Sequence, residues 1–170
     1  MSDTPILIGL GANLPSAVGP PVATLQAALD RLAGVGVITR QRSRWFESAP
    51  APPSDQPWFV NGVAAVATAL DPAALLATLH RIEAEFGRAR GAPNAPRTLD
   101  LDLLAYGDRV EAPAPGDAGP ILPHPRLGER AFVLLPLADV APTWYHPASG
   151  RPLSDLIGAL GDTRTTQPLE

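Results

Sequence analysis

Apolar residues in the first part of the chain change their spacing from segment to segment, and each spacing predicts an element. Residues 6–10 form a continuous apolar run that ends in glycines and an asparagine, as expected of a buried strand and its loop. Residues 22–32 carry leucines and alanines at helical spacing. Alternating β-branched residues predict a strand over 35–46, and 58–70 is predicted as a long strand. Four prolines within 48–57 predict a loop between these strands.

The second part begins with a clear helix start, Asp71 as the N-cap and Pro72 in the first turn. An apolar stripe at helical spacing follows, and Gly87 is expected to end it. Residues 98–106 are predicted as a strand, reached through a loop over 88–96.

The C-terminal part is less regular. Residues 113–125 are rich in proline and are expected to be irregular. Residues 129–140 are predicted as a helix that Pro136 kinks or interrupts, and 153–160 as a short final helix.

The order strand, helix, two strands, helix, strand is that of the split βαβ, ferredoxin-like arrangement. It predicts an α+β fold with a mostly antiparallel sheet, helices on one face and a C-terminal extension. With 170 residues the chain has the size of one domain, so residues 1–170 are expected to form a single unit.

Charge and residue usage exclude several functions. Thirteen basic against 17 acidic residues give a net charge of −4, which does not favour nucleic acid or an anionic membrane as a partner. All basic residues are arginine, which excludes a Walker P-loop, the strand lysine of protein kinases and Schiff-base chemistry. The absence of cysteine excludes thiol catalysis and disulfides. Without a signal peptide pattern or a long apolar run, a cytoplasmic protein is expected.

Two aspartates in the strand predicted over 98–106 are the sharpest chemical feature. Asp100 and Asp102 are two residues apart, so they share a face and lie ~6.6–6.8 Å apart along the strand. Leu99, Leu101 and Leu103 would then face the core. Such a pair can hold one or two hard cations, or it can be the solvated acidic face of a surface strand. Aspartate is poorly suited to strands, which favours the metal site.

Arginines gather in the residues just before this pair. Arg88 and Arg97 bracket the loop, and Arg81 and Arg90 lie nearby. Guanidinium groups suit phosphate oxygens, so arginines beside two carboxylates point to a nucleotide bound with Mg²⁺. The alternative is a solvated surface in which glutamates of the preceding helix pair with these arginines.

Taken together, the chain resembles the 6-hydroxymethyl-7,8-dihydropterin pyrophosphokinase family of folate biosynthesis from Ile8 to about Pro142. The resemblance rests on five motifs that occur in the family's order. They are Gly11-x-Asn13-Leu14, Asp55-Gln56-Pro57-x-Phe59-x-Asn61, Arg81-Ile82-Glu83 with Gly87-Arg88-x-Arg90, Pro96-Arg97-Thr98-Leu99-Asp100-Leu101-Asp102, and His124 with Arg130-x-Phe132-x-Leu134-x-Pro136-Leu137.

The resemblance implies transfer of pyrophosphate from ATP to the pterin alcohol with release of AMP, and two Mg²⁺ ions as cofactors. The expected partners are ATP and 6-hydroxymethyl-7,8-dihydropterin, with no nucleic acid and no membrane, and a monomer is expected. It assigns metal ligation to Asp100 and Asp102 and phosphate contacts in catalysis to Arg88 and Arg97. The pterin contacts that it implies are Ser48, Ala51, Phe59, Asn61, Asp100 and Phe132. The ATP contacts that it implies are His80, Glu83, Arg88, Arg90, Arg97, Leu103, His124 and Arg130.

The chain departs from the family in the loop before the Pro-Arg-Thr motif. Residues 91–95 lack a tryptophan that many members carry, so weaker loop closure over bound substrates is expected. Two other functions stay open from the residues alone. One is a different metal-dependent enzyme, such as a nucleotidyl- or glycosyltransferase with an Asp-x-Asp pair. The other is a non-catalytic ferredoxin-like domain that binds a ligand.

Overall fold

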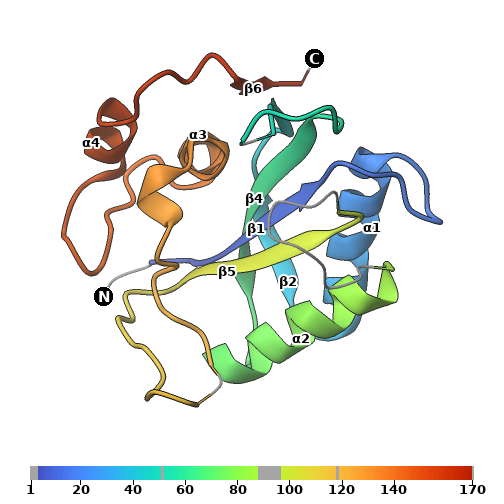
Figure 1. Cartoon of the computed structure of the whole chain (residues 1–170). Coiled ribbons are helices and arrows are strands. Elements are labelled where there is room, and N and C mark those ends of the chain that lie inside the picture. The colour runs from blue at the N-terminus through green and yellow to red at the C-terminus, as the bar shows by residue number, and fades with distance from the viewer. Residues whose placement is uncertain (1–3, 51, 88–96, 118, 170) are drawn as a thin grey trace.

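An antiparallel sheet runs through the middle of the molecule (Figure 1). The structure is a computed structural model, and it describes residues 4–50, 52–87, 97–117 and 119–169. Strand β1 (Ile6–Ala12) lies between β4 (Phe59–Ala67) and β5 (Asp100–Tyr106) and is antiparallel to both. Strands β2 (Ile38–Arg42) and β3 (Phe46–Ser48) pair with opposite ends of β4, and β6 (Thr166–Pro168) pairs with β3.

Helices cover both faces of this sheet. On one face, α1 (Pro21–Gly34) and α2 (Pro72–Glu85) close a core of leucine, isoleucine and valine side chains (Figure 1). On the other face lie α3 (Ala131–Val140), α4 (Leu153–Gly158) and the short 3₁₀ turn η1 (Leu127–Glu129). The prediction of helices on one face was therefore wrong.

The second helical layer has a physical cause in the strands themselves. Residues of β1, β4 and β5 alternate between the two faces, and both alternating sets are largely apolar. Leu7, Val63 and Leu104 face away from α1 and α2, and they are buried only because α3 and α4 cover them. A sheet whose two faces are both apolar needs a layer on each side.

The helix starts follow the local sequence. Asp71 caps α2 by accepting a hydrogen bond from the Ala74 amide at 2.8 Å, and Pro72 occupies the first turn, as predicted. Gly87 follows α2 with a φ of 83°, a left-handed conformation that glycine adopts without a steric penalty. Helix α3 is not interrupted at Pro136, the sixth of its ten residues, although a proline there removes one backbone hydrogen bond.

The strand predicted over 35–46 is instead two strands, β2 and β3, separated by residues 43–45. At this break the Val63 amide of β4 donates to the Ser43 hydroxyl at 2.9 Å and not to a backbone carbonyl. Trp45 crosses β4 at Gly62, where an added Cβ would lie 2.6 Å from the indole. A glycine at this point lets the tryptophan approach the strand. The pairing of β6 with β3 was not predicted.

Among the described residues, no helix has both the length and the apolar character needed to cross a membrane.

Candidate functional site

Two glycines of β1 form the floor of the site. Gly11 pairs with Asn61 on one side and with Asp100 on the other. Gly9 pairs in the same way with Val63 and Asp102. Residues directly opposite each other in antiparallel strands point to the same face. Neither glycine has a side chain, and neighbouring side chains fill the space that this leaves: an ideal Cβ on Gly11 would lie 2.8 Å from Asn61 Oδ1, and one on Gly9 would lie 3.3 Å from the Leu104 side chain.

The two aspartates share this face, as their spacing predicts. Leu101 and Leu103, which alternate with them along β5, are buried in the core against α1 and α2. Asp100 and Asp102 are half-buried and lie on the α3 side of the sheet. The acidic pair is therefore not the fully solvated surface of an edge strand.

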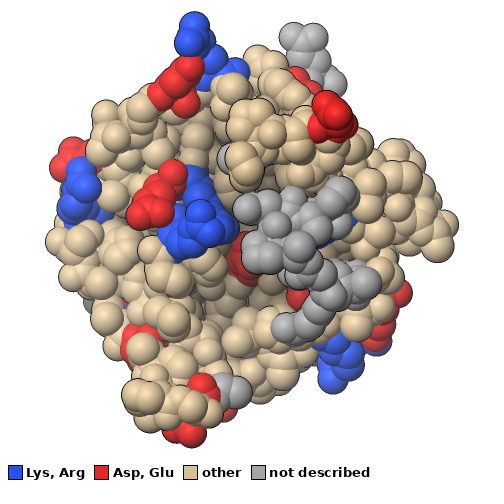
Figure 2. Space-filling model, in the orientation of Figure 1, with Lys and Arg blue, Asp and Glu red and all other residues tan. Residues whose placement is uncertain are grey.

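Arginines adjoin the carboxylates. Arg97 donates from Nη1 to Asp100 Oδ2 at 3.1 Å, and both side chains are about three-quarters buried. Burial lowers the pKa of Arg130 below its ordinary value, and Asp102 opposes that shift. Arg126 and Asp100 also act on Arg130, so the charged groups of this site lie within electrostatic reach of one another. Figure 2 shows basic and acidic surface side by side around a hollow on this side of the molecule.

His124 joins the cluster from the segment that precedes η1. Its amide donates to the Leu104 carbonyl at 2.8 Å, which holds the segment beside β5. Burial lowers the pKa of His124, the charge of Arg130 lowers it further, and Asp100 opposes both. Its Nδ1 accepts the Arg126 amide at 3.1 Å, so in the neutral ring the proton is on Nε2. The imidazole thus offers one N–H donor to a ligand.

Predicted pterin contacts come from β3, β4 and the first turn of α3. Asn61 is buried and donates from Nδ2 to Ser48 Oγ at 2.6 Å. Phe59, two residues earlier on the same face of β4, is half-buried. Phe132 is half-buried in the first turn of α3, where the Arg130 guanidinium lies 5.4 Å from its ring centroid. An amide, a hydroxyl and two aromatic rings are groups that bind a flat heterocycle.

Other predicted ATP contacts occupy different environments. Glu83 is buried on α2 and accepts the Leu101 amide at 2.8 Å, which satisfies a donor of the edge strand β5. Leu103 has its side chain in the core, so any contact with a nucleotide would involve its backbone. His80 is exposed on α2. Ala51, Arg88, Arg90 and the loop residues 91–95 lie outside the described residues.

Asn13 is a site residue that the sequence analysis quoted only as part of a motif. It is 2% exposed, and its side chain bonds to the loop before β4 and to the segment before β5. The available signal was an asparagine directly after an apolar strand, where an amide that becomes buried has to find hydrogen-bond partners.

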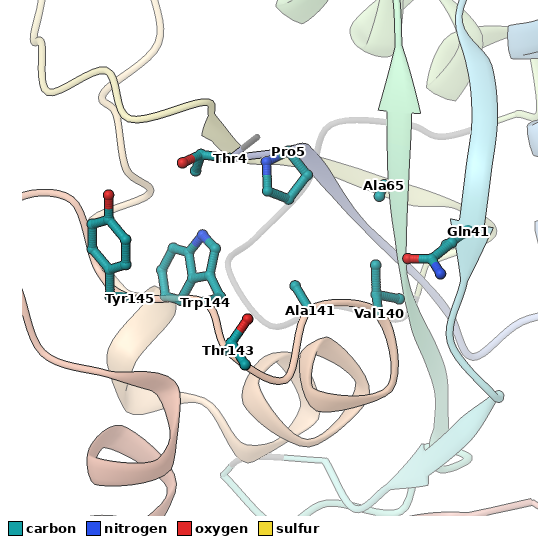
Figure 3. A pocket seen from close by; sticks show the side chains of 9 residues that line it. All are labelled: Thr4, Pro5, Gln41, Ala65, Val140, Ala141, Thr143, Trp144 and Tyr145. Atoms are coloured by element: carbon teal, nitrogen blue, oxygen red, sulfur yellow. The ribbon is translucent and has the colours of Figure 1, made fainter. Parts of the chain in front are cut away.

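The described residues contain no group of three or more histidine or acidic side chains that could hold a metal ion. A pocket of about 360 Å³ lies elsewhere, beside Trp144 at the end of α3 (Figure 3). No charged side chain and no predicted site residue lines it, so it has no group that suits a nucleotide phosphate.

Comparison with known proteins identifies the family. The sequence model of 7,8-dihydro-6-hydroxymethylpterin-pyrophosphokinase matches residues 7–142. A 2-amino-4-hydroxy-6-hydroxymethyldihydropteridine pyrophosphokinase of Synechocystis is 44% identical over 153 residues, which are 89% of this chain and 73% of the relative. One of Pseudomonas aeruginosa is 42% identical over 91% of this chain and 90% of its own length. The folic acid synthesis protein fol1 of Pneumocystis carinii is 34% identical over 92% of this chain, which spans only 20% of that protein.

Solved structures agree on the fold. A crystal structure of an HPPK-DHPS in complex with substrates superposes with a TM-score of 0.67 at 12% identity, over 92% of this chain and 45% of that one. The wild-type HPPK-DHPS of Plasmodium falciparum has a TM-score of 0.67 at 14% identity, over 92% of this chain and 41% of that one. The motifs, the match over residues 7–142 and the relatives above 40% identity together mean that this chain belongs to the 7,8-dihydro-6-hydroxymethylpterin-pyrophosphokinase family.

Proposed function

We propose that this chain transfers the pyrophosphoryl group of ATP to the hydroxymethyl oxygen of 6-hydroxymethyl-7,8-dihydropterin and releases AMP. The observation that carries the proposal is the glycine floor, with two carboxylates and guanidinium groups on one side and a buried amide on the other. In the reaction, the hydroxyl oxygen forms a bond to the β-phosphorus and the bond from that phosphorus to the α–β bridging oxygen breaks. AMP leaves with that oxygen, and the hydroxyl proton passes to solvent.

The acidic pair fits Mg²⁺. This ion usually binds to one or two protein carboxylates and completes its octahedron with water and substrate phosphates. Asp100 and Asp102 supply two carboxylates, half-buried, on one strand face and beside two residues without side chains. When bound, Mg²⁺ would neutralise negative charge on the phosphates and help to align the reacting groups. We propose that Asp100 and Asp102 together would hold two such ions.

The chain's own residues then divide the work. Arg97 and Arg130 bind phosphate oxygens and offset the charge that develops on the transferred group. His124 adds a neutral donor from Nε2. Asn61 and Ser48 hydrogen-bond to the polar edge of the pterin, and the ring lies on the sheet face that carries Gly11 and Asp100. This places the acceptor hydroxyl next to the carboxylates, which lowers the entropic cost of bringing two substrates together.

The finer details of the fold also remain proposals. We infer that β1, α1, β2 with β3, β4, α2 and β5 form a ferredoxin-like core. The strand order β5-β1-β4 followed by β2 and β3, all antiparallel to their neighbours, supports this. The residues after α3 would be a C-terminal extension whose α4 adds to the second core. A single domain and a monomer stay predictions.

The direct test is to measure AMP formation from ATP, Mg²⁺ and the pterin alcohol. We expect the wild-type chain to form AMP and pterin diphosphate in equal amounts. Asp100→Asn and Asp102→Asn should each abolish turnover, while their urea midpoints stay close to that of the wild type. Asp108→Asn is the matched control, since Asp108 is exposed in the turn after the far end of β5. Turnover of a sugar nucleotide without AMP formation would favour the glycosyltransferase alternative.

A further inference from the structure

We propose that Asn13 is a positioning residue that couples the pterin side of the site to its phosphate side. This inference rests on the proposed function and goes beyond it, because Asn13 itself touches neither the aspartates nor Asn61 by any hydrogen bond described here. Asn13 directly follows β1, the strand that carries the glycine floor. Its neighbours in space are the two segments that lead into the two halves of the site.

The amide of Asn13 bonds in both directions. Toward the pterin side, Nδ2 donates to Gln56 Oε1 at 2.8 Å and to the Pro57 carbonyl at 3.0 Å. These residues immediately precede β4, which carries Phe59 and Asn61. Both Nδ2 hydrogens are used, so the loop before β4 is held at two points.

Toward the phosphate side, the side-chain oxygen of Asn13 accepts the Arg97 amide at 2.8 Å. The backbone amides of Asn13 and Leu14 both donate to the Arg97 carbonyl, at 3.0 and 3.1 Å. The peptide groups on either side of Arg97 are thus held by one residue and its neighbour. Arg97 in turn is paired with Asp100 at 3.1 Å, so its backbone position affects the guanidinium and the carboxylate together.

Burial makes this link rigid. Asn13 is 2% exposed, so water does not readily replace its partners, and a lost partner leaves a buried polar group unsatisfied. The strands that follow these two segments, β4 and β5, also pair with β1, but at Gly11 the pairing with Asn61 and Asp100 involves only the backbone of the glycine. The Asn13 side chain bonds to the segment just before β4 and also to the segment just before β5. A shift of either segment would therefore be passed to the other.

The test uses two changes from amide to acid. In Gln56→Glu the new carboxylate still accepts from Asn13, so we expect kcat/KM within about 3-fold of the wild type. In Asn13→Asp the Arg97 amide keeps its acceptor, and Gln56 can turn its amide to donate to the new carboxylate. The Pro57 carbonyl, however, loses its donor and faces a carboxylate oxygen, so a loss of about 10-fold is expected. The double variant places two carboxylates 2.8 Å apart, and we expect a loss of about 100-fold, as is typical for a misplacement of about 1 Å. Gln26→Glu is the control, because Gln26 is exposed on α1.

A second readout separates positioning from stability. The affinity for the pterin is measured by fluorescence with and without a non-hydrolysable ATP analogue and Mg²⁺. The ratio of the two affinities should fall toward one in Asn13→Asp/Gln56→Glu and stay at the wild-type value in the control. Asn13→Asp/Gln56→Leu removes the carboxylate at position 56. Its kcat/KM should be at least 5-fold higher than that of Asn13→Asp/Gln56→Glu, and it replaces that variant in the test if that variant does not fold.

The outcomes are distinct. No AMP formation by the wild type would reject the proposed function itself. AMP formation by the wild type, together with additive losses and an unchanged affinity ratio in the double variants, would overturn the role of Asn13 and leave the proposed function in place.

Discussion

Replacing Gly11 by alanine tests whether the glycine floor is required. An ideal Cβ at this position would lie 2.8 Å from Asn61 Oδ1, where ordinary contacts begin at 3.4 Å, so the amide would have to move by about 0.6 Å. Asn61 is 5% exposed and bonded to Ser48 at 2.6 Å, which leaves it little freedom to move. Gly9→Ala is a matched control on the same strand and face, because its Cβ would meet only the Leu104 side chain at 3.3 Å.

The expected magnitudes follow from these contacts. Overpacking of a buried site costs about 1–3 kcal/mol, and weakening the Asn61–Ser48 hydrogen bond costs about 1 kcal/mol more. Alanine in place of glycine recovers about 0.5–1 kcal/mol through lower chain entropy. We therefore expect Gly11→Ala to lower the free energy of unfolding by about 1–3 kcal/mol and to weaken pterin binding. Gly9→Ala should change the stability by less than about 1 kcal/mol, since a leucine side chain can adjust.

Urea denaturation of a double-mutant cycle with Asn61→Ala is the decisive assay. Without the Asn61 amide the clash is gone, so Gly11→Ala should cost nothing or be slightly stabilising in that background. A coupling above about 1 kcal/mol is expected for residues in contact. If Gly11→Ala costs the same with and without the Asn61 side chain, the reasoning about the floor is wrong, and the glycine would serve another purpose.

Three further predictions concern charged groups. Arg97→Ala should lower kcat at least 10-fold more than it lowers pterin affinity, because the guanidinium acts mainly on charge in the transition state. Steady-state kinetics and pterin titration test this, and equal losses in kcat and pterin affinity would contradict it. Burial lowers the pKa of His124, so between that pKa and 6.5 the unfolded chain binds a proton that the folded chain does not. The stabilising contribution of the neutral His124 ring should therefore be complete above pH 6.5 and decrease as the pH falls below it. Urea midpoints measured from pH 5 to 8 should depend less on pH in His124→Gln than in the wild type. An unchanged pH dependence would assign it to another group. Burial tends to raise the pKa of Asp139, but the hydrogen bonds from Arg44 at 2.9, 3.0 and 3.1 Å lower it overall. Because Arg44 is 63% exposed, Asp139→Asn should lower the free energy of unfolding by only about 0.5–1 kcal/mol, measured by thermal denaturation at pH 7. A decrease above about 2 kcal/mol would show that the Arg44–Asp139 pair is more than a surface contact.

Local patterns were sufficient where one segment decides its own structure. The Asp71-Pro72 start, the end of α2 at Gly87 and the sharing of one face by Asp100 and Asp102 follow from capping, backbone freedom and the twofold repeat of a strand. The family, too, could be identified from motifs in order, because each motif carries residue types that its chemistry needs. The three structural features depend on neighbours within a few positions.

Features that depend on distant partners could not be predicted in this way. At the break between β2 and β3, Trp45 lies against Gly62 across the sheet, and β6 pairs with the open edge of β3. The second helical layer depends on the apolar residues of three separate strands. Each case is set by long-range contacts, whose partners no local pattern names.

The sequence by itself determined which chemical groups this protein has: aspartates two residues apart, arginine as the sole basic side chain, and no thiol. Only the tertiary structure decided how they are brought together, with Gly9 and Gly11 between the carboxylates and the β4 side chains, and Asn13 between the segments that lead to them. The physical reason is that a side chain's chemistry belongs to one residue, whereas burial and proximity arise from segments that meet only when the sheet pairs.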